Sequence, residues 1–191
     1  MSRIANCAQR VPHEVHQRGF SLPELMVTIG IMSIASAIGF STLLRYGDQY
    51  RVKGATVQVA EELSRTRQEA IRTRLCHFFD RTSTTQYRIV RDNPAAPDCT
   101  LSADDTTLRT INLSSQFPGV TFNQGSNDVD PFGGAITGPS PTSMRFEARG
   151  LVTTTGGSGI YLKSTNYGPW AVTITAAGAV HTWRKDGSAW N

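Results

Sequence analysis

The sequence predicts an α+β protein in which one long N-terminal helix packs on an antiparallel β-sheet. Two patterns indicate this class. An apolar run and then an amphipathic helical pattern occupy the chain from residue 20 to residue 79. After Asp80, short alternating or β-branched runs are separated by stretches rich in Gly, Pro, Asn and Asp, which is typical of strands and turns. The 191 residues suffice for one folded domain behind the helix.

The segment "RGFSLPELMVTIGIMSIASAIGF" (residues 18–40) carries the apolar run. From Phe20 to Phe40 there are 21 residues, and Glu24 is the only charged one. A helix of that length spans roughly 30 Å, the thickness of the hydrocarbon core of a bilayer. A secretory signal has a shorter apolar region that is followed by a small-residue cleavage site. Here the polar residues come first, so we expect the run to stay on the chain as a membrane anchor.

The stretch "GFSLPE" (residues 19–24) resembles the class III leader of type IV prepilins and type II secretion pseudopilins. The resemblance implies that a prepilin peptidase cuts after Gly19, that the new N-terminal amine of Phe20 is methylated, and that Glu24 helps to dock the subunit into a filament. It also implies the pilin fold and three segments, namely a leader (1–19), a transmembrane and filament-core helix (20–44) and a pilin-like globular domain (45–191).

The leader is positively charged. Arg3, Arg10 and Arg18 stand against Glu14, so the leader carries +2 of the formal charge of +4 of the whole chain. By the positive-inside rule this predicts a cytoplasmic N-terminus, a single pass through the inner membrane and a periplasmic C-terminal domain. The processed chain keeps a formal charge of about +2, so it is not strongly basic.

A glutamate at position 24 needs a physical explanation. A carboxylate in hydrocarbon costs a few kcal/mol. The freed amine of Phe20 in a neighbouring subunit is a suitable cation to offset this cost, and the pair would set the axial stagger of packed helices. The alternative is a plain membrane anchor with an acid near the interface.

The helix is expected to continue far beyond the apolar run. Apolar residues recur at spacings of three, four and seven, as on one face of an amphipathic helix: Val52, Val59, Leu63, Ala70, Ile71, Leu75 and Phe78. We therefore predict one helix over residues 23–79. The arginines between the apolar positions are interleaved with acids and are expected to form a solvated or subunit-contacting face: Arg65, Arg67, Arg72 and Arg74.

The second part of the chain is predicted to form the sheet. Strands are expected at Tyr87–Arg91, Leu108–Leu113, Val120–Phe122, Ser143–Ala148, Ile160–Lys163, Trp170–Thr175 and Ala179–Arg184. Residues 176–178, Ala-Ala-Gly, predict a hairpin between the last two strands, because Gly178 can adopt positive φ.

Three further stretches resemble one family within the type IV pilin-like proteins. "LSRTRQEAIRTR" (63–74), "MRFEARG" (144–150) and "AVTITAAGAV" (171–180) resemble the helix, later strands and final hairpin of the FimT/GspH pseudopilin family. Relatives often carry Gly-Arg after the final turn, where this chain has Gly178 and Ala179. The resemblance implies a minor filament component that primes assembly or lies near the tip. Its partners would be other pilins or pseudopilins, the prepilin peptidase and the inner membrane.

Cysteine usage fits an oxidising compartment. Cys7 lies in the leader, which leaves Cys76 and Cys99 as an even pair. We expect a disulfide between them, which would contribute on the order of 3 kcal/mol. The alternative is two unpaired buried thiols.

We find no set of residues that predicts catalysis, and no cofactor is expected. Outside the leader, His77 and His181 do not lie in a motif with a nucleophile and an acid. "GGSG" (156–159) lacks the Lys-Ser/Thr of a phosphate loop and is expected to be a turn. Asp128 and Asp130 offer oxygens for calcium in the loop 123–142, but no acid completes the EF-hand spacing, so no metal is predicted.

A nucleic-acid site is the alternative from the binding class. Some FimT-like pilins are associated with DNA uptake. Arg184 and Lys185 could meet phosphates, and Trp183 could stack on bases. The other explanation is an ordinary strand end. The sequence thus predicts a structural protein of a type IV pilus, with a type II secretion pseudopilin and a DNA-binding minor pilin as alternatives.

Overall fold

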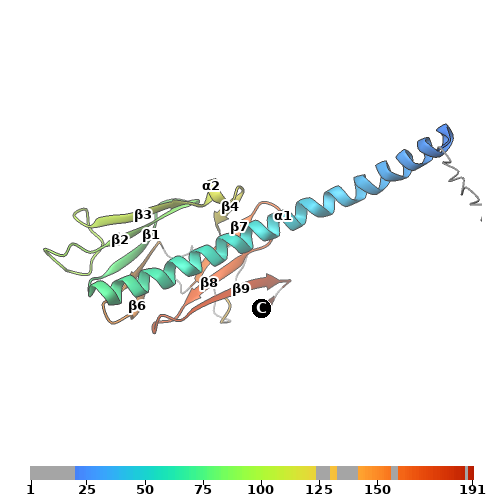
Figure 1. Cartoon of the computed structure of the whole chain (residues 1–191). Coiled ribbons are helices and arrows are strands. Elements are labelled where there is room, and N and C mark those ends of the chain that lie inside the picture. The colour runs from blue at the N-terminus through green and yellow to red at the C-terminus, as the bar shows by residue number, and fades with distance from the viewer. Residues whose placement is uncertain (1–19, 124–129, 133–141, 156–158, 188) are drawn as a thin grey trace, which may run out of the picture. The chain divides into compact units, whose positions relative to one another are not determined.

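The computed structural model of the chain describes residues 20–123, 130–132, 142–155, 159–187 and 189–191, without the side chains of residues 41–45 and 155. It divides into two compact units, Met1–Ser41 and Thr42–Asn191. The helix α1 (Leu22–Thr73) runs through both. The second unit combines the later turns of α1 with two antiparallel sheets (Figure 1). The prediction of an α+β fold is confirmed.

Local sequence explains where α1 begins and ends. The backbone N–H of Leu25 donates to the carbonyl of Ser21 (3.1 Å), which closes the first turn. Pro23 is tolerated there because the first N–H groups of a helix have no acceptor within it. The helix ends at Thr73, and the next residue, Arg74, has a φ of 58°. A residue in this left-handed region commonly terminates a helix.

The helix is shorter than predicted. Residues 77–79, which we expected to be helical, belong to β1 (His77–Arg81). In this strand the two phenylalanines alternate, since Phe79 lies in the main core whereas Phe78 packs with Cys76 and Val90 on the other face. Leu75 and Phe78 matched the helical spacing by coincidence, and the left-handed turn at Arg74 overrides it.

The strands form two sheets, not the single sheet that we predicted. The first has the order β3-β2-β1-β5-β6 and the second β10-β9-β8-β7-β4, and all pairings are antiparallel. The strands of the first sheet, besides β1, are β2 (Gln86–Arg91), β3 (Thr106–Asn112), β5 (Ser143–Phe146) and β6 (Val152–Thr155). Those of the second are β4 (Val120–Phe122), β7 (Gly159–Ser164), β8 (Trp170–Ile174), β9 (Val180–Asp186) and β10 (Ala189–Trp190).

Each of the seven predicted strands overlaps an observed one, and the predicted hairpin joins β8 to β9. Gly178 in that hairpin has a φ of +83°. The strands β1, β6 and β10 were missed. Leu113, expected to end a strand, instead begins the short helix α2 (Leu113–Gln116), because the side chain of Asn112 caps it by accepting a hydrogen bond from the N–H of Ser114 (3.0 Å).

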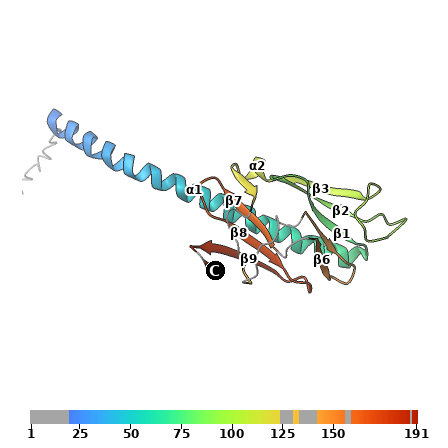
Figure 2. The same cartoon turned by 180° about the vertical axis from the view of Figure 1, so that it is seen from behind.

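The second half of α1 lies along both sheets and supplies one side of the core (Figures 1 and 2). Its inward residues have no exposed surface: Val52, Ala55, Val59, Leu63 and Ala70. They pack with Phe79, Tyr87, Ile89, Met144 and Phe146 of the first sheet and with Val120, Phe122, Ile160, Leu162, Val172 and Ile174 of the second. Ile71, which we expected on this face, is exposed.

Arg67 ties the two sheets to the helix. Its Nε donates to the carbonyl of Gly150 (2.9 Å) in the turn between β5 and β6. Its Nη2 donates to the carbonyl of Ala177 (3.0 Å) in the turn between β8 and β9. A backbone bond from the N–H of Val152 to the carbonyl of Ala176 (2.9 Å) also joins these turns. The prediction that Arg67 is part of a solvated or subunit-contacting face is therefore wrong.

Replacement of Gly178 by alanine tests this tie. A Cβ at Gly178 would collide with Nε of Arg67, whereas a Cβ at Gly119, which has a similar φ of +84°, would meet no atom within 4 Å. Both variants bear the cost of alanine in the left-handed region, about 1 kcal/mol. Gly178→Ala should lose about 2 kcal/mol more, because Arg67 must give up its hydrogen bonds to the two turns. Urea unfolding of the two variants in detergent micelles measures the difference, and equal losses would contradict the role of Arg67.

Candidate functional site

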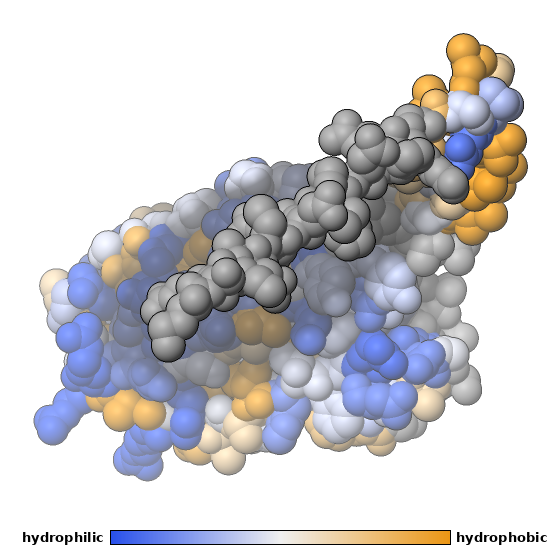
Figure 3. Space-filling model, turned by 45° about the vertical axis from the view of Figure 1, so that its right-hand side comes forward, coloured by the Kyte–Doolittle hydropathy of each residue, from blue (hydrophilic) through white to orange (hydrophobic). Residues whose placement is uncertain are grey.

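The N-terminal half of α1 is the clearest candidate site. From Leu22 to Phe40 the helix is long and apolar enough to cross a membrane, and none of this stretch is buried. Phe20, just before it, is 79% exposed. Figure 3 shows hydrophobic side chains of this run at the surface. A helix that is apolar all round needs an apolar environment, which a bilayer or other such helices can provide. This single helix fits a membrane-anchored protein.

Two hydroxyl groups within the run donate hydrogen bonds to backbone carbonyls of the same helix. Oγ1 of Thr28 donates to the carbonyl of Leu25 (2.9 Å), and Oγ of Ser33 donates to the carbonyl of Ile29 (2.8 Å). Such bonds to the preceding turn remove much of the cost of a hydroxyl in hydrocarbon. These two hydroxyl groups therefore do not prevent insertion of the run.

Glu24 differs from these residues. It lies in the first turn of α1, where the positive end of the helix dipole favours an acid. Its carboxylate makes no hydrogen bond or ion pair with any part of the chain that the structure describes. The dipole is a partial compensation only, so a Glu24 placed in an apolar environment would still gain from a cation supplied by another molecule. Gly19, the predicted cleavage position, lies outside the described residues.

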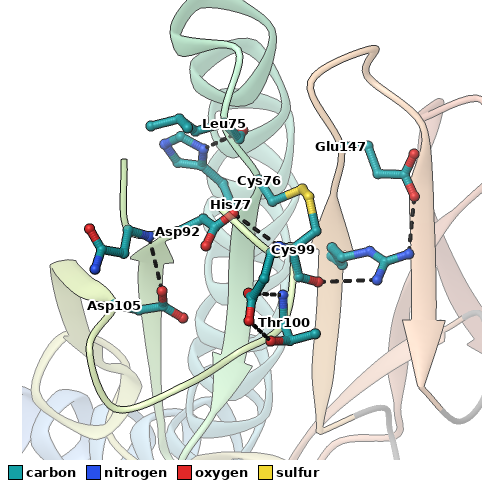
Figure 4. Close-up of a disulfide and its surroundings, with 11 residues drawn as sticks. Leu75, Cys76, His77, Asp92, Cys99, Thr100, Asp105 and Glu147 are labelled. Carbon is teal, nitrogen blue, oxygen red and sulfur yellow. Dashed lines mark hydrogen bonds and ion pairs between the residues drawn. A yellow bond between two sulfur atoms is a disulfide. The ribbon is translucent and has the colours of Figure 1, made fainter. Parts of the chain in front are cut away.

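A disulfide joins Cys76 and Cys99, with their Cα atoms 5.3 Å apart (Figure 4). Cys99 has a φ of 55°, and both its backbone N–H and its carbonyl are hydrogen-bonded. Its N–H donates to the carboxylate of the buried Asp92 (3.1 Å), and its carbonyl accepts from Nη1 of Arg145 (3.1 Å). The bridge thereby fixes the loop between β2 and β3 on the outer face of the first sheet.

The three predicted DNA-binding residues do not form one surface. They are consecutive in β9, so Trp183 and Lys185 point to one face of the strand and Arg184 to the other. Arg184 is the cross-strand neighbour of Trp170, which packs against the core, and its Nη2 binds Asp186 (3.0 Å). Arg184 therefore does not share a face with Trp183 and Lys185, and a DNA-binding role of the three residues stays a prediction.

The face that carries Trp183 and Lys185 is rich in aromatic side chains. Nε1 of Trp183 donates to Oγ1 of Thr173 (2.8 Å), and its ring contacts those of Phe132 and His181. Nζ of Lys185 lies 5.7 Å from the centre of the Trp190 ring, which also contacts Tyr161. Burial, and to a lesser extent the charge of Asp130, raises the pKa of Tyr161 to about 12. We call Tyr161, His181, Trp183, Lys185 and Trp190 the aromatic face.

The acids considered for calcium and the two histidines lie in different parts of the chain. Asp128, one of the two acids considered for calcium, lies outside the described residues. Asp130 accepts a hydrogen bond from the N–H of Phe132 (2.9 Å), as in an Asx turn. His181 is exposed, whereas His77 is buried at the end of α1 with its Nδ1 3.2 Å from the carbonyl oxygen of Leu75.

Sequence reasoning missed an ionic network beside His77. Arg109 of β3 reaches α1, where it pairs with Glu62 (3.0 Å) and Glu69 (3.1 Å). Glu69 also accepts from Nε of Arg65 (3.1 Å). Burial is the largest single influence on the pKa of Glu69 and raises it. The hydrogen bonds and charges of Arg109 and Arg65 together outweigh burial, so the net direction is downward. Arg109 is 40 residues from Glu69, and no local signal could have paired them.

His77 should make stability depend on pH. Burial lowers the pKa of His77, the charges of Arg91 and Arg109 act in the same direction, and Glu69 and the Leu75 carbonyl oppose them. Below pH ~6.5 the unfolded chain therefore binds more protons than the folded one, so stability falls as the pH falls. We expect the urea midpoint to decrease from pH 7.5 to pH 5.5 less in His77→Gln than in the original protein. The matched variant His181→Gln, at an exposed position, should keep the full decrease, and equal slopes in all three would contradict the effect.

Comparison with known sequences identifies the N-terminal segment. The prokaryotic N-terminal methylation motif matches residues 15–40. No curated protein and no solved structure matches the chain. The matched residues include the predicted cleavage position, Glu24 and the exposed apolar part of α1. The chain therefore carries a type IV prepilin-like N-terminal methylation motif in front of an α+β domain, which supports a type IV pilin-like protein.

Proposed function

We propose that the chain is a minor pilin or pseudopilin of the FimT/GspH type, which inserts in the inner membrane and then assembles into, primes or caps a type IV pilus. The observation that carries this proposal is the methylation motif on an exposed apolar helix whose carboxylate, Glu24, has no partner in the described chain. The apolar surface of this helix can be buried in a bilayer, but a cation for Glu24 would come from a neighbouring subunit. The α+β domain behind it would supply contacts to neighbouring subunits.

Processing comes first in the proposed sequence of events. The prepilin peptidase cuts after Gly19 and methylates the freed amine of Phe20, so the chain is the substrate of an enzyme and performs no chemistry itself. The intact mass of the protein from cells should correspond to a chain that begins at Phe20 and carries one added methyl group. The unprocessed mass in the presence of an active peptidase would contradict the proposal.

Assembly follows from charge pairing. A subunit that enters a growing filament places the carboxylate of Glu24 near the Phe20 amine of its neighbour. In an apolar environment each charge is costly alone, and the pair is formed at one axial offset only. The interaction thus selects the register of the packed helices.

The same features are compatible with a minor pseudopilin of a type II secretion system. In-cell crosslinking of the native protein, followed by mass spectrometry of the attached proteins, distinguishes the two. Crosslinks to the major or minor pilins support the pilus. Crosslinks to secretion pseudopilins support the alternative, and the absence of crosslinks to either class would contradict both.

The aromatic face favours a further role, DNA capture by a minor pilin during natural transformation. Trp183, Trp190 and Lys185 combine rings that could stack on bases with a cation that could meet a phosphate. We expect weak, salt-dependent binding of DNA that Lys185→Gln reduces and that Lys53→Gln, at an exposed position of α1, does not. No binding at low ionic strength would exclude this role.

A further inference from the structure

The C-terminal end of α1 borders a pocket of about 290 Å³ that the proposed function does not use. The last turns of the helix meet β1, β2 and β3 there. The side chains that line the pocket are Glu69, Arg72, Thr73, His77, Arg91, Leu108 and Arg109. Three guanidinium groups and a histidine thus surround one carboxylate.

The positive charge of this pocket is only partly compensated. Arg109 is paired with Glu62 and Glu69, and Glu69 is also held by Arg65. Arg72 and Arg91, in contrast, make no ion pair with any described residue. The acid in the wall is therefore engaged by two arginines through Oε1, while its Oε2 has no hydrogen-bond partner among the described residues. Arg72 and Arg91 have no acidic partner among these residues.

Arg91 has one donor without an acceptor in the described part of the chain. Its Nε is shielded from solvent and has no hydrogen-bond partner among the residues that the structure describes. A buried N–H without an acceptor is unfavourable, and native proteins rarely keep one. His77 lies opposite Arg91 in the β1–β2 pairing, on the same face of the sheet. An anion between them would satisfy Nε of Arg91 and compensate its charge.

We propose that this pocket is an oxyanion-binding site, in which Arg72, Arg91 and His77 hold a phosphate or a carboxylate group. Arginine suits this role because its planar fork donates two parallel hydrogen bonds to such groups. Arg72, which is exposed at the end of α1, would bind the ligand from the solvent side, and Arg91 would bind it from the sheet. None of the residues that line the pocket belongs to the N-terminal motif.

Titration of the full chain in non-ionic detergent micelles tests the site. Sodium phosphate and sodium acetate are added separately and compared with sodium chloride at equal ionic strength and pH. The first readout is the Tm, which should rise by about 3 °C when the anion is at ten times its Kd. The second readout is the pKa of His77, which is measured by NMR. The His77 signal is the one that is absent from the spectrum of His77→Gln. A bound anion should raise it by on the order of 1.

Variants separate a specific site from general screening of charge. Arg91→Gln and Arg72→Gln should each abolish both responses. Arg149→Gln removes the same charge from an exposed turn outside the pocket and should leave them intact. Use of two arginine variants keeps the test valid if Arg91→Gln does not fold.

The outcomes decide both the site and its ligand. A response to phosphate alone assigns a phosphate ligand, and a response to acetate alone assigns a carboxylate. The proposal is overturned if neither anion exceeds chloride, or if the responses persist in both Arg91→Gln and Arg72→Gln.

Discussion

Glu24→Gln and Glu24→Ala are expected to be processed normally and yet to be absent from filaments. In our proposal processing precedes assembly, so cleavage after Gly19 should not require the Glu24 carboxylate to have a partner. Incorporation does require it in our proposal, since a filament subunit without the carboxylate leaves the Phe20 amine of its neighbour unpaired among apolar helices. Loss of one member of a buried charge pair costs about 2–5 kcal/mol. We therefore expect at least a tenfold decrease in incorporated protein.

Quantitative immunoblots of sheared filaments and of membranes measure this loss. The membrane fraction should contain each variant at the original level, with the mass of the processed and methylated chain. Glu61→Gln is the matched control, because Glu61 is an exposed acid in the same helix. Normal incorporation of Glu24→Ala would rule out the pairing and leave Glu24 as an acid that only favours the first turn of α1.

Loss of the disulfide is expected to have the largest effect on stability. The bridge joins residues that are 23 positions apart, and closure of such a loop stabilises a fold by about 3 kcal/mol. Without it, Cys99 is released from its left-handed conformation, and the buried Asp92 loses the N–H that it binds. For a chain of this size the Tm should fall by on the order of 10 °C. Thermal unfolding of a Cys76→Ser/Cys99→Ser variant measures the change.

Reduction provides the control for this variant. Dithiothreitol should lower the Tm of the original protein to that of the double variant and should not affect the variant itself. A titration of denatured, unreduced protein should find no free thiol at Cys76 or Cys99. Free thiols at both positions, or an equal Tm for variant and original, would contradict the prediction.

The sequence was sufficient for the fold class and for most strands, because alternation and turn residues are local signals. It was insufficient at the end of α1. "LCHFF" (residues 75–79) continues the helical spacing, and only the left-handed turn at Arg74 and the pairing of β1 with β2 and β5 show that the helix has ended. The division into two sheets depends on contacts between distant strands, so it could not be read from local patterns.

The candidate sites show the same contrast. The methylation motif lies within one continuous segment, residues 15–40, and could be identified directly. The prediction that Trp183, Arg184 and Lys185 contribute to DNA binding overlooked one local signal, since consecutive residues in a strand point to opposite faces. The contacts of Arg67 with Gly150 and Ala177 span 83 and 110 residues, and no local pattern encodes them.

The position of Arg67 has a consequence for how the domain opens. The helix contributes to the core of both sheets, and one guanidinium group reaches a turn of each. The two sheets should therefore not separate from each other before the domain unfolds. Both should unfold as one cooperative unit. A protease would then find the sheet strands accessible only after the whole domain has opened. In the proposed function, this would keep the subunit folded while it moves from the membrane into a filament.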